Sequence, residues 1–586
     1  MASWLLLAAA QPGLLRPDGF GHLAFTALVP WALVARRPGP RARLVEWGAA
    51  VLGLALWFGW MRALLPILLV PMTVIPALYF LLAGRVLRGL APRWPLALAV
   101  PVAWMVFELV RWFLPFPFSF GWWRLGTLAA DTEWLAGSAR VWGVWGLSYT
   151  FAAFAGWVAD CILAWRQEVP LARFGLGLHV AGLGPVALAA ALSAAVPAPA
   201  TEAGPGALLV TPGLAQERKA FSQDPLLERF LDPLDLTVQG LARAQAKGQS
   251  IDFVAWPESM LPAVVVEEGV LEAFDAGTRG SPFLNREWTR IDLQLLQETT
   301  QELVRGVIFG ERALVSRPLR ERLARHPGAA GQAWREGRPL LPSGVAFVAG
   351  VESVVVEDAE LRRLNAVCVW HAGRPSALAS KQHLVPAAED PYPAAHFPWL
   401  VSAIHAVAGY VPDFVVRDAP RILAVEGGAA RSFQMGVAVC YDQAFDRPFT
   451  SALRSGPLDF HLVASNEAWY ERTLEMDHML AFARLRAICT GRAVLRATNS
   501  GISGLVDARG RVRGLIVQDG RRKQVRGTQA ITVPVPVAGS SGTLTPYVAT
   551  EPYQIGFWWL LALFGWIASR PRVTHGESGV GEGAAS

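Results

Sequence analysis

Long apolar segments dominate the first third of the chain. A helix that crosses a bilayer needs about 20 predominantly apolar residues, with roughly 17 as a lower limit. Such segments recur up to residue 196 and appear once more near the end of the sequence, which predicts a membrane-embedded helical bundle. The predicted spans lie near residues 4–15, 20–35, 45–63, 64–84, 94–113, 141–165, 174–196 and 555–569, of which the first two and the last are short.

Arginines in the loops between these segments predict the orientation of the bundle, because positively charged loops stay on the cytoplasmic side of a membrane. With a cytoplasmic N-terminus, the basic loops all fall on that side, and residues from about 200 to 550 lie outside the cytoplasm. The arginines are Arg36, Arg37, Arg41 and Arg43 after the second span, Arg85, Arg88 and Arg93 after the fourth, Arg166 and Arg173 after the sixth, and Arg570 and Arg572 after the last.

The composition narrows the class of protein further. Charged residues make up 17% of the chain, against roughly 25% in soluble proteins. We attribute the net charge of +6 to membrane topology, since no basic patch interleaved with aromatic residues indicates nucleic-acid binding. Four scattered cysteines are too few for a disulfide framework or a cysteine zinc site. The histidines lack ligand spacing, so neither a metal nor a cofactor is expected.

Between about residues 200 and 550 the pattern changes to short apolar runs separated by helical stretches. This alternation predicts an α/β fold with a buried sheet and helices packed on it. A helix is expected over 475–490. The stretch 311–342 is rich in Arg, Gly and Pro and lacks periodicity, so it is expected to be an inserted loop. The predicted strands are Ala207–Thr211, Asp252–Trp256, Val345–Val351, Ala366–Trp370, Met435–Cys440 and Phe460–Ala464.

Four regions follow from these patterns. We expect a membrane domain of about seven spans over 1–199, an extracytoplasmic domain over 200–550, a membrane span over 551–570 and a disordered cytoplasmic tail over 571–586. Glu108 is costly in hydrocarbon, so it is expected to face the bundle interior with Arg111 as its partner. The aromatic loop 113–123 is expected to anchor the bundle at the interface or to line a path for lipid.

Three chemically capable residues each follow an apolar run: Glu258, Lys381 and Cys440. A cysteine is a strong nucleophile as the thiolate, and Cys440 is expected to lie near the N-terminus of the next helix, which favours the anion. Glu258 could act as general base for the thiol, and Lys381 could stabilise a developing oxyanion. Each residue also has a structural interpretation: a surface carboxylate, a solvated lysine and a core cysteine.

Several motifs extend this pattern beyond the three residues. They include Trp256-Pro257-Glu258-Ser259, the segment 381–386, Cys440-Tyr441-Asp442, Ser465-Asn466-Glu467-Ala468-Trp469, and the run from Ala483 to Ser503. Together they resemble the carbon-nitrogen hydrolase (nitrilase-like) superfamily, and within it the membrane branch, apolipoprotein N-acyltransferase. The resemblance covers nearly the whole chain. It implies an αββα sandwich joined to a multi-span membrane domain.

The resemblance also implies an activity and a location. Glu258, Lys381 and Cys440 would form a catalytic triad that moves an acyl chain from a phospholipid, through a Cys440 thioester, to the N-terminal diacylglyceryl-cysteine of apolipoproteins. The protein would be a monomer in the bacterial inner membrane, with its catalytic domain on the periplasmic side and no cofactor. Supporting or substrate-binding positions would be Glu389, Tyr441, Asp442, Trp469 and Gln216.

Some positions depart from the family pattern. Ala220 stands where the family has Trp, with Phe221 next to it, and Ala387-Ala388 and Tyr470-Glu471 each replace Phe-Gly. These departures leave two other functions open. One is a membrane-tethered amidase, or an acyltransferase for another amine. The other is a weakly active paralogue that binds lipoproteins.

Overall fold

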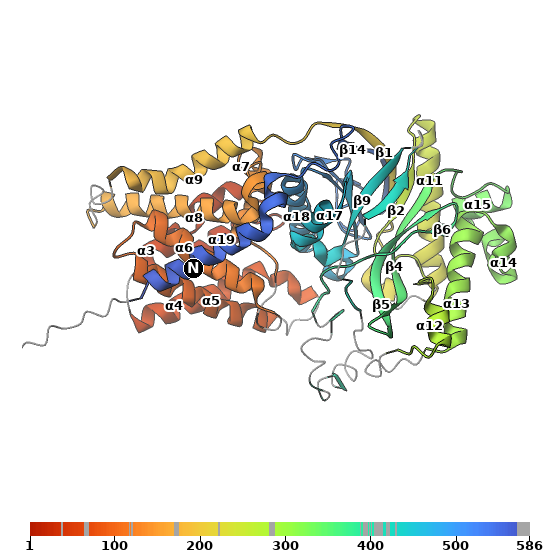
Figure 1. Ribbon diagram of the computed structural model, residues 1–586, viewed down its shortest axis with the longest axis horizontal. Helices are drawn as coiled ribbons and strands as arrows, with labels where there is room; N and C mark the ends of the chain where they lie inside the picture. The colour runs from red at the N-terminus through yellow and green to blue at the C-terminus, as the bar shows by residue number, and fades with distance from the viewer. Residues whose placement is uncertain are drawn as a thin grey trace, which may run out of the picture.

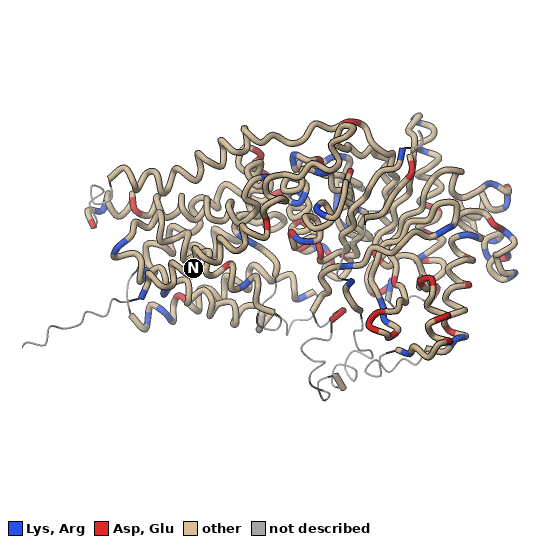
Figure 2. Tube along the Cα trace, viewed as in Figure 1, with Lys and Arg blue, Asp and Glu red and all other residues tan. Residues whose placement is uncertain are grey.

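The computed structural model describes residues 1–36, 39–63, 69–115, 118, 121–168, 175–220, 223–280, 288–386, 388–390, 397, 399, 401–402, 414–417, 422–427 and 431–570. A helical bundle and an α/β sandwich lie side by side in it (Figure 1). Charged residues are sparser on the bundle than on the sandwich (Figure 2). Part of the aromatic loop, the predicted tail and some individual predicted positions (Arg37, Arg173, Phe221, Ala387 and Arg572) lie outside the described residues.

The bundle holds a membrane-length apolar helix at four of the eight predicted spans. Within the described residues, four helices are long and apolar enough to cross a membrane: α5 (Leu69–Leu90), α6 (Leu96–Phe113), α8 (Ala139–Trp165) and α9 (Gly175–Ala195). Each overlaps a predicted span, although α5 extends six residues beyond the predicted end at 84. Around them lie α1 (Ala2–Ala10), α2 (Ala24–Ala27), α3 (Val29–Ala35), α4 (Pro40–Trp57), α7 (Glu133–Ala136), α19 (Pro546–Ala568) and the 3₁₀ turns η1 (Gly21–Leu23), η2 (Gly59–Ala63) and η4 (Leu125–Asp131).

The structure corrects the first two predicted spans. Helix α1 ends at Ala10 after nine residues, and the chain then turns through Gly13 and Gly19, both with positive φ. The second segment is divided between η1, α2 and α3. Pro30, at the start of α3, has no backbone N–H for a continuous helix. Apolar composition placed both segments among the spans but did not reveal these breaks.

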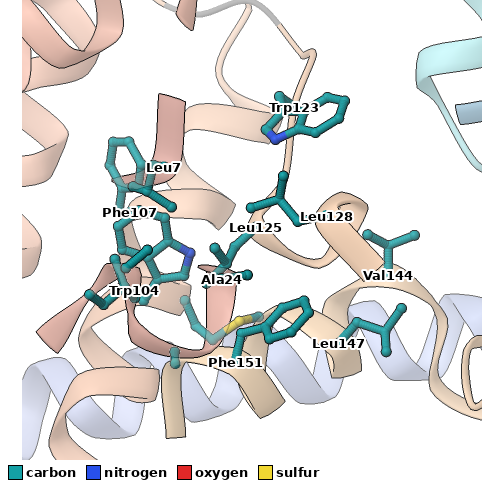
Figure 3. Close-up of a cluster of buried hydrophobic side chains, with 14 of the residues drawn as sticks. Leu7, Ala24, Trp104, Phe107, Trp123, Leu125, Leu128, Val144, Leu147 and Phe151 are labelled. Carbon is teal, nitrogen blue, oxygen red and sulfur yellow. The ribbon is translucent and has the colours of Figure 1, made fainter. Parts of the chain in front are cut away.

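Helices α6 and α8 form the centre of the bundle. Figure 3 shows apolar side chains from α6, α8 and η4, among them Trp104, Phe107 and Phe151, gathered in this interior. A Cβ at Gly156 would lie 2.1 Å from the carbonyl oxygen of Leu96, so this glycine lets α8 approach α6 closely. The Asp160 carboxylate accepts the backbone N–H of Ala97 at 2.9 Å and so satisfies the start of α6.

Glu108 is fully buried in the bundle, as its sequence context predicted. Its carboxylate accepts the indole N–H of Trp104 at 2.9 Å and the backbone N–H of Leu125 at 2.5 Å. Arg111 is also buried and donates to the carbonyl of Trp123. Both residues therefore connect α6 to the segment that follows it, which contacts the sandwich through Gly121 and Arg124.

The predicted basic loops meet at the end of the bundle away from the sandwich. Arg36 after α3 pairs with Glu168 after α8. Arg88 near the end of α5 donates to the carbonyl of Ala35 at 3.1 Å, and Arg93 donates to the carbonyl of Ala568 at the end of α19 at 3.0 Å. The C-terminal ends of α3, α5, α8 and α19 thus share one side of the bundle.

The sandwich consists of two sheets with parallel strands at their centres. Phe253 of one sheet stacks on Phe460 of the other, with ring centroids 5.9 Å apart. In the described residues the first sheet has the order β14 (Gly527–Pro536), β1 (Thr201–Thr211), β2 (Phe253–Trp256), β4 (Ala346–Glu357), β5 (Glu360–His371), β6 (Arg374–Pro375), with β3 (Val264–Val266) beside β4 and β7 (Ala379–Ser380) beside β5. The second has the order β13 (Val512–Arg513), β12 (Gly504–Val506), β11 (Ala493–Thr498), β10 (Phe460–Ser465), β9 (Ser432–Val439), β8 (Ile422–Glu426).

Helices cover the outer face of each sheet, which makes the domain an αββα sandwich of the nitrilase-like kind. Apolar residues of the first sheet pack against α11 (Asp232–Ala246), η6 (Leu227–Leu231) and η8 (Glu302–Ile308). Those of the second sheet pack against α17 (Arg447–Ser455) and α18 (Glu475–Thr490). The remaining helical segments are α10 (Gln216–Ala220), α12 (Val270–Asp275), α13 (Arg290–Gln301), η9 (Arg312–Leu314), η11 (Cys440–Ala444) and η12 (Glu467–Tyr470).

The stretch 311–342 is not the irregular loop that its composition predicted. It contains α14 (Arg317–Arg325) and α15 (Ala329–Arg335), and Leu319 and Leu323, one turn apart on α14, are buried against the first sheet's helix layer. The Asp235 carboxylate of α11 accepts the backbone N–H of Ala330 at 2.8 Å. Four arginines cover the exposed part of α14 and conceal this narrow apolar stripe in the sequence.

A buried ion pair joins the bundle to the sandwich. Arg124, between α6 and η4, donates to the carboxylate of Asp446 at 2.8 Å, and Arg486 of α18 pairs with the same carboxylate. The Arg124 guanidinium also lies over the rings of Trp112 and Trp145, at 4.4 and 4.7 Å from their centroids. An exposed pair, Arg511 with Glu133, spans the same two parts at the surface.

We predict that Arg124→Met lowers the free energy of unfolding by about 3 kcal/mol, because breaking a buried ion pair leaves an incompletely compensated charge. The matched variant Arg511→Met should cost less than about 1 kcal/mol, since solvent screens an exposed pair. Denaturant unfolding of both variants in the same detergent measures the difference. Equal losses would show that burial of the Arg124–Asp446 pair does not determine how much it contributes to the free energy of unfolding.

Candidate active site

The predicted catalytic residues lie just after the carboxyl ends of three strands. Glu258 lies two residues after β2, Lys381 directly follows β7, and Cys440 directly follows β9. Asn466 follows β10, which pairs in parallel with β9. The structure therefore brings Glu258, Lys381 and Cys440 together at one edge of the sandwich, from both sheets.

Lys381 lies between two carboxylates. Its Nζ is 3.6 Å from Oε1 of Glu258 and 2.8 Å from Oε2 of Glu389, and its side chain is 1% exposed. Burial lowers the pKa of Lys381, but the negative charges of Glu389 and Glu258 outweigh burial and raise it overall. The ammonium therefore stays charged at neutral pH and can stabilise negative charge on a neighbouring atom.

Hydrogen bonds fix the Glu258 carboxylate. Oε1 accepts from the side-chain amide of Asn365 at 2.7 Å, and Oε2 accepts from the backbone N–H of Asn466 at 2.8 Å. The Asn365 amide also donates to Glu389 at 2.9 Å. Lys219 of α10 donates to the backbone carbonyl of Glu258 at 2.8 Å. A carboxylate that accepts two hydrogen bonds and faces a lysine is held in one orientation.

Cys440 is buried and adopts a left-handed backbone conformation with φ +48°. Burial and the charge of Glu258 raise the pKa of its thiol well above the usual value, against the opposing effect of Lys381. Cys440 begins a helical segment, as expected, but this segment is only the five-residue 3₁₀ turn η11, and the next α-helix begins at Arg447. The turn does not favour the anion, because burial raises the pKa of the thiol. At rest the sulfur is a thiol, and its activation needs a base such as Glu258.

The neighbours of Cys440 connect the turn η11 (Cys440–Ala444), called the nucleophile turn below, to other parts of the molecule. Tyr441 donates its hydroxyl proton to the carbonyl of Gly121 in the bundle at 2.9 Å. Asp442 accepts the backbone N–H groups of Val439 at 2.9 Å and of His383 at 2.7 Å. Asp442 thereby ties the turn that bears Cys440 to the loop that bears Lys381.

The other predicted supporting residues occupy different places. Glu389 also accepts the backbone N–H of Val385 at 2.8 Å, which closes the loop after Lys381. Gln216 accepts the side-chain amide of Asn466 at 2.9 Å, so α10 contacts the site. Trp469 lies on η12 and is 48% exposed, so its side chain is not packed into the triad.

Asn365 was not identified from the sequence, yet it bridges the two carboxylates that flank Lys381. Its only signal is a polar residue next to the apolar run 366–370 in β5. A lone asparagine in a strand is uninformative until the strand's neighbours are known. Its partner Glu258 lies 107 residues away in the sequence.

Two family models match different parts of the chain. The apolipoprotein N-acyltransferase N-terminal domain matches residues 3–157, over the bundle, and the carbon-nitrogen hydrolase domain matches residues 343–521, over much of the sandwich. The chain belongs to the apolipoprotein N-acyltransferase family. The two matches cover both parts of the molecule, and Lys381 and Cys440 lie within the second.

Individual relatives agree with the family assignment. An apolipoprotein N-acyltransferase of Azotobacter vinelandii is 26% identical over 82% of this chain and 75% of its own length. One from Pseudomonas aeruginosa is 26% identical over 80% and 72%. One from Nitrosomonas europaea is 31% identical, but over only 22% of this chain and 25% of its own. Among solved structures, an amidase of the nitrilase superfamily from Nesterenkonia is 16% identical over 62% of this chain and 99% of its own, with a TM-score of 0.30.

The charges around Cys440 generate opposite predictions for two substitutions. Glu258→Gln removes a negative charge that raises the pKa of the thiol, so the thiolate fraction at pH 8 should rise. Lys381→Met removes a positive charge that lowers this pKa, so the thiolate fraction should fall. The rate of Cys440 modification by methyl methanethiosulfonate, followed by peptide mass, should therefore increase in the first variant and decrease in the second.

Glu321→Gln, an exposed change on α14, serves as the matched control and should leave the modification rate unaltered. If both site variants changed the rate in the same direction, altered access to the thiol would explain the data better than electrostatics. The order of the three rates thus decides between the two causes.

Proposed function

We propose that this protein transfers an acyl chain from a phospholipid to the α-amine of the N-terminal diacylglyceryl-cysteine of apolipoproteins. The acyl chain passes through a thioester on Cys440. Glu258 acts as general base and acid, and Lys381 stabilises the oxyanion. The expected partners are therefore a phospholipid, diacylated apolipoproteins and the membrane that holds them.

One observation carries the proposal: the nucleophile turn is bonded to the membrane bundle. Tyr441, next to Cys440, donates to Gly121, and its ring lies parallel to that of Trp122, with centroids 6.0 Å apart. A soluble amidase has no need to attach its nucleophile to a bundle with helices long enough to cross a membrane. Both proposed substrates are lipids held in the bilayer, so a thiol at this junction is within reach of each.

In the first half-reaction, Glu258 takes the thiol proton and the sulfur attacks the ester carbonyl of the phospholipid. The negative charge on the carbonyl oxygen faces the Lys381 ammonium. The C–O bond then breaks, and Glu258 returns the proton to the departing alcohol oxygen of the lyso-phospholipid. A carbon–sulfur bond has replaced a carbon–oxygen bond, and Glu258 is again a carboxylate.

In the second half-reaction, the neutral α-amine of the lipoprotein attacks the thioester. A carbon–nitrogen bond forms and the carbon–sulfur bond breaks. Glu258 accepts the proton lost by the amine and delivers it to the sulfur, which restores the Cys440 thiol. Because that thiol has a raised pKa, it holds its proton and the enzyme returns to its resting state.

The proposed orientation follows from the two ends of the bundle. The loops that carry Arg36, Arg88 and Arg93 gather at the end opposite the sandwich. If these loops face the cytoplasm, as the positive-inside rule expects, the catalytic domain faces the periplasm. The protein would then act as a monomer in the bacterial inner membrane.

We predict that wild-type protein incubated with phosphatidylethanolamine gains the mass of one acyl chain, and that Cys440→Ala gains none. Neutral hydroxylamine should remove the adduct, because it cleaves thioesters and leaves ordinary esters largely intact. Intact-mass spectrometry of the protein in lipid nanodiscs makes the measurement. Addition of a diacylated lipopeptide with a free N-terminus should discharge the adduct and yield a triacylated peptide.

Other outcomes separate the alternative functions. Discharge by water or a different amine, but not by the lipopeptide, would favour a membrane-tethered amidase or an acyltransferase for another acceptor. Absence of any adduct on a folded protein that still binds lipopeptide would favour a binding paralogue. The lipopeptide with a blocked N-terminus is the matched control, since it has the same lipid but no nucleophilic amine.

A further inference from the structure

A buried arginine behind the nucleophile contacts both turns that hold the catalytic groups. Arg496 of β11 has no exposed surface. Its Nη1 donates to Oε1 of Gln443, and its Nη2 donates to Oε1 of Glu467 at 2.6 Å. Nε donates to the carbonyl of Ile502 at 2.9 Å, which fixes the plane of the guanidinium.

Gln443 links Arg496 to Cys440 through two hydrogen bonds. With its amide oxygen bound by Arg496, its amide nitrogen donates to the backbone carbonyl of Cys440 at 3.0 Å. Cys440 needs such support because a residue with a side chain rarely adopts positive φ unless its surroundings enforce it. The Gln443 side chain is fully buried, so water does not compete for the bond.

Glu467 links Arg496 to the turn that binds Glu258. Glu467 directly follows Asn466, whose backbone N–H holds the Glu258 carboxylate. The Glu467 side chain is fully buried, and a Cβ at Gly501 would lie 1.9 Å from its Oε2, so a larger residue there would displace the carboxylate. One guanidinium therefore spans the turn that bears Cys440 and the turn that orients Glu258.

A second carboxyl group, that of Glu475, interacts electrostatically with the Arg496–Glu467 pair. Glu475, in the first turn of α18, is fully buried, and among the described residues neither of its oxygens has a hydrogen-bond partner. Burial and the charge of Glu467 raise its pKa well above the usual value, and Asp477 adds to this, while Arg496 and Lys523 oppose it. Burial therefore disfavours the charged form of Glu475, and the hydrogen bond of the Arg496 guanidinium goes to Glu467.

We propose that Arg496 is a positioning residue that keeps Cys440 and Glu258 in reactive register, through Gln443 on one side and Glu467 on the other. The inference rests on the proposed function, in which Glu258 must take the proton of Cys440. It assigns a kinetic role to residues that touch neither substrate. A misplacement of about 1 Å between reacting groups can slow catalysis about 100-fold.

The test separates positioning from folding by changing Gln443 in two ways. Gln443→Glu can still accept from Arg496, but its carboxylate cannot donate to the Cys440 carbonyl. Gln443→Met loses both bonds. Gln434→Met, on the same strand as the nucleophile but remote from the site, is the matched control; its amide donates to Ser432 at 3.4 Å.

The substrate is a short-chain p-nitrophenyl ester, which can acylate Cys440 without a phospholipid. We expect both Gln443 variants to acylate 10- to 100-fold more slowly per active site, as counted by burst titration, with little change in KM. The melting temperature of Gln443→Glu should stay near that of the wild type. Arg496→Lys should show the same rate loss, since one ammonium cannot span both turns.

A normal rate per active site in Gln443→Glu and Gln443→Met, with only fewer active molecules or lower melting temperatures, would overturn the inference. The ester keeps this result apart from the proposed function. If the wild type reacts with the ester but never with phospholipid, the acyl donor is wrong, while the comparison among variants still decides the role of Arg496.

Discussion

The left-handed backbone at Cys440 is the constraint on which the site depends. It ends strand β9 abruptly and turns the next residues toward different parts of the molecule. Tyr441 bonds to the bundle, and Asp442 bonds to the lysine loop. Because one short turn makes these contacts, the position of the sulfur is set by the sandwich and the bundle together. Strain in such a turn persists only where the surrounding structure enforces it.

The electrostatics of the site favour a protonated nucleophile and a charged lysine. A buried ammonium is costly unless carboxylates compensate it, and Glu258 and Glu389 supply that compensation on either side of Lys381. Burial, together with the negative charge of Glu258 and Glu389, raises the pKa of the Cys440 thiol and favours its protonated form. A carbonyl that develops an oxyanion near Lys381 would reverse this balance. The arrangement therefore avoids a permanently reactive thiolate, which oxidants could attack.

The sequence predicted much of this architecture for identifiable physical reasons. Buried strands appear as short apolar runs, and the helix 475–490 was predicted with the bounds that the structure has. Polar residues just after strands predicted that Glu258, Lys381 and Cys440 would meet. Asn365 and the helices of 311–342 could not be found, because their meaning depends on partners far away in the chain. A helical turn does begin at Cys440, but burial and the charge of Glu258 raise the pKa of the thiol, so the expected preference for the anion is absent.

The joint between the two parts explains why a membrane protein can use a nitrilase-like site. Helix α18 packs on the second sheet with one set of residues, including Met476 and Leu480, and on the bundle with another, including Phe482 and Leu485. Helix α18 thus covers the second sheet and also lines the bundle interior. The buried pair of Arg124 with Asp446 holds this contact only five residues from Tyr441 and its bond to Gly121, and Arg486 of α18 pairs with the same carboxylate. Movement of the sandwich against the bundle would disturb the nucleophile turn itself. The position of the thiol relative to the bundle is therefore a property of the fold.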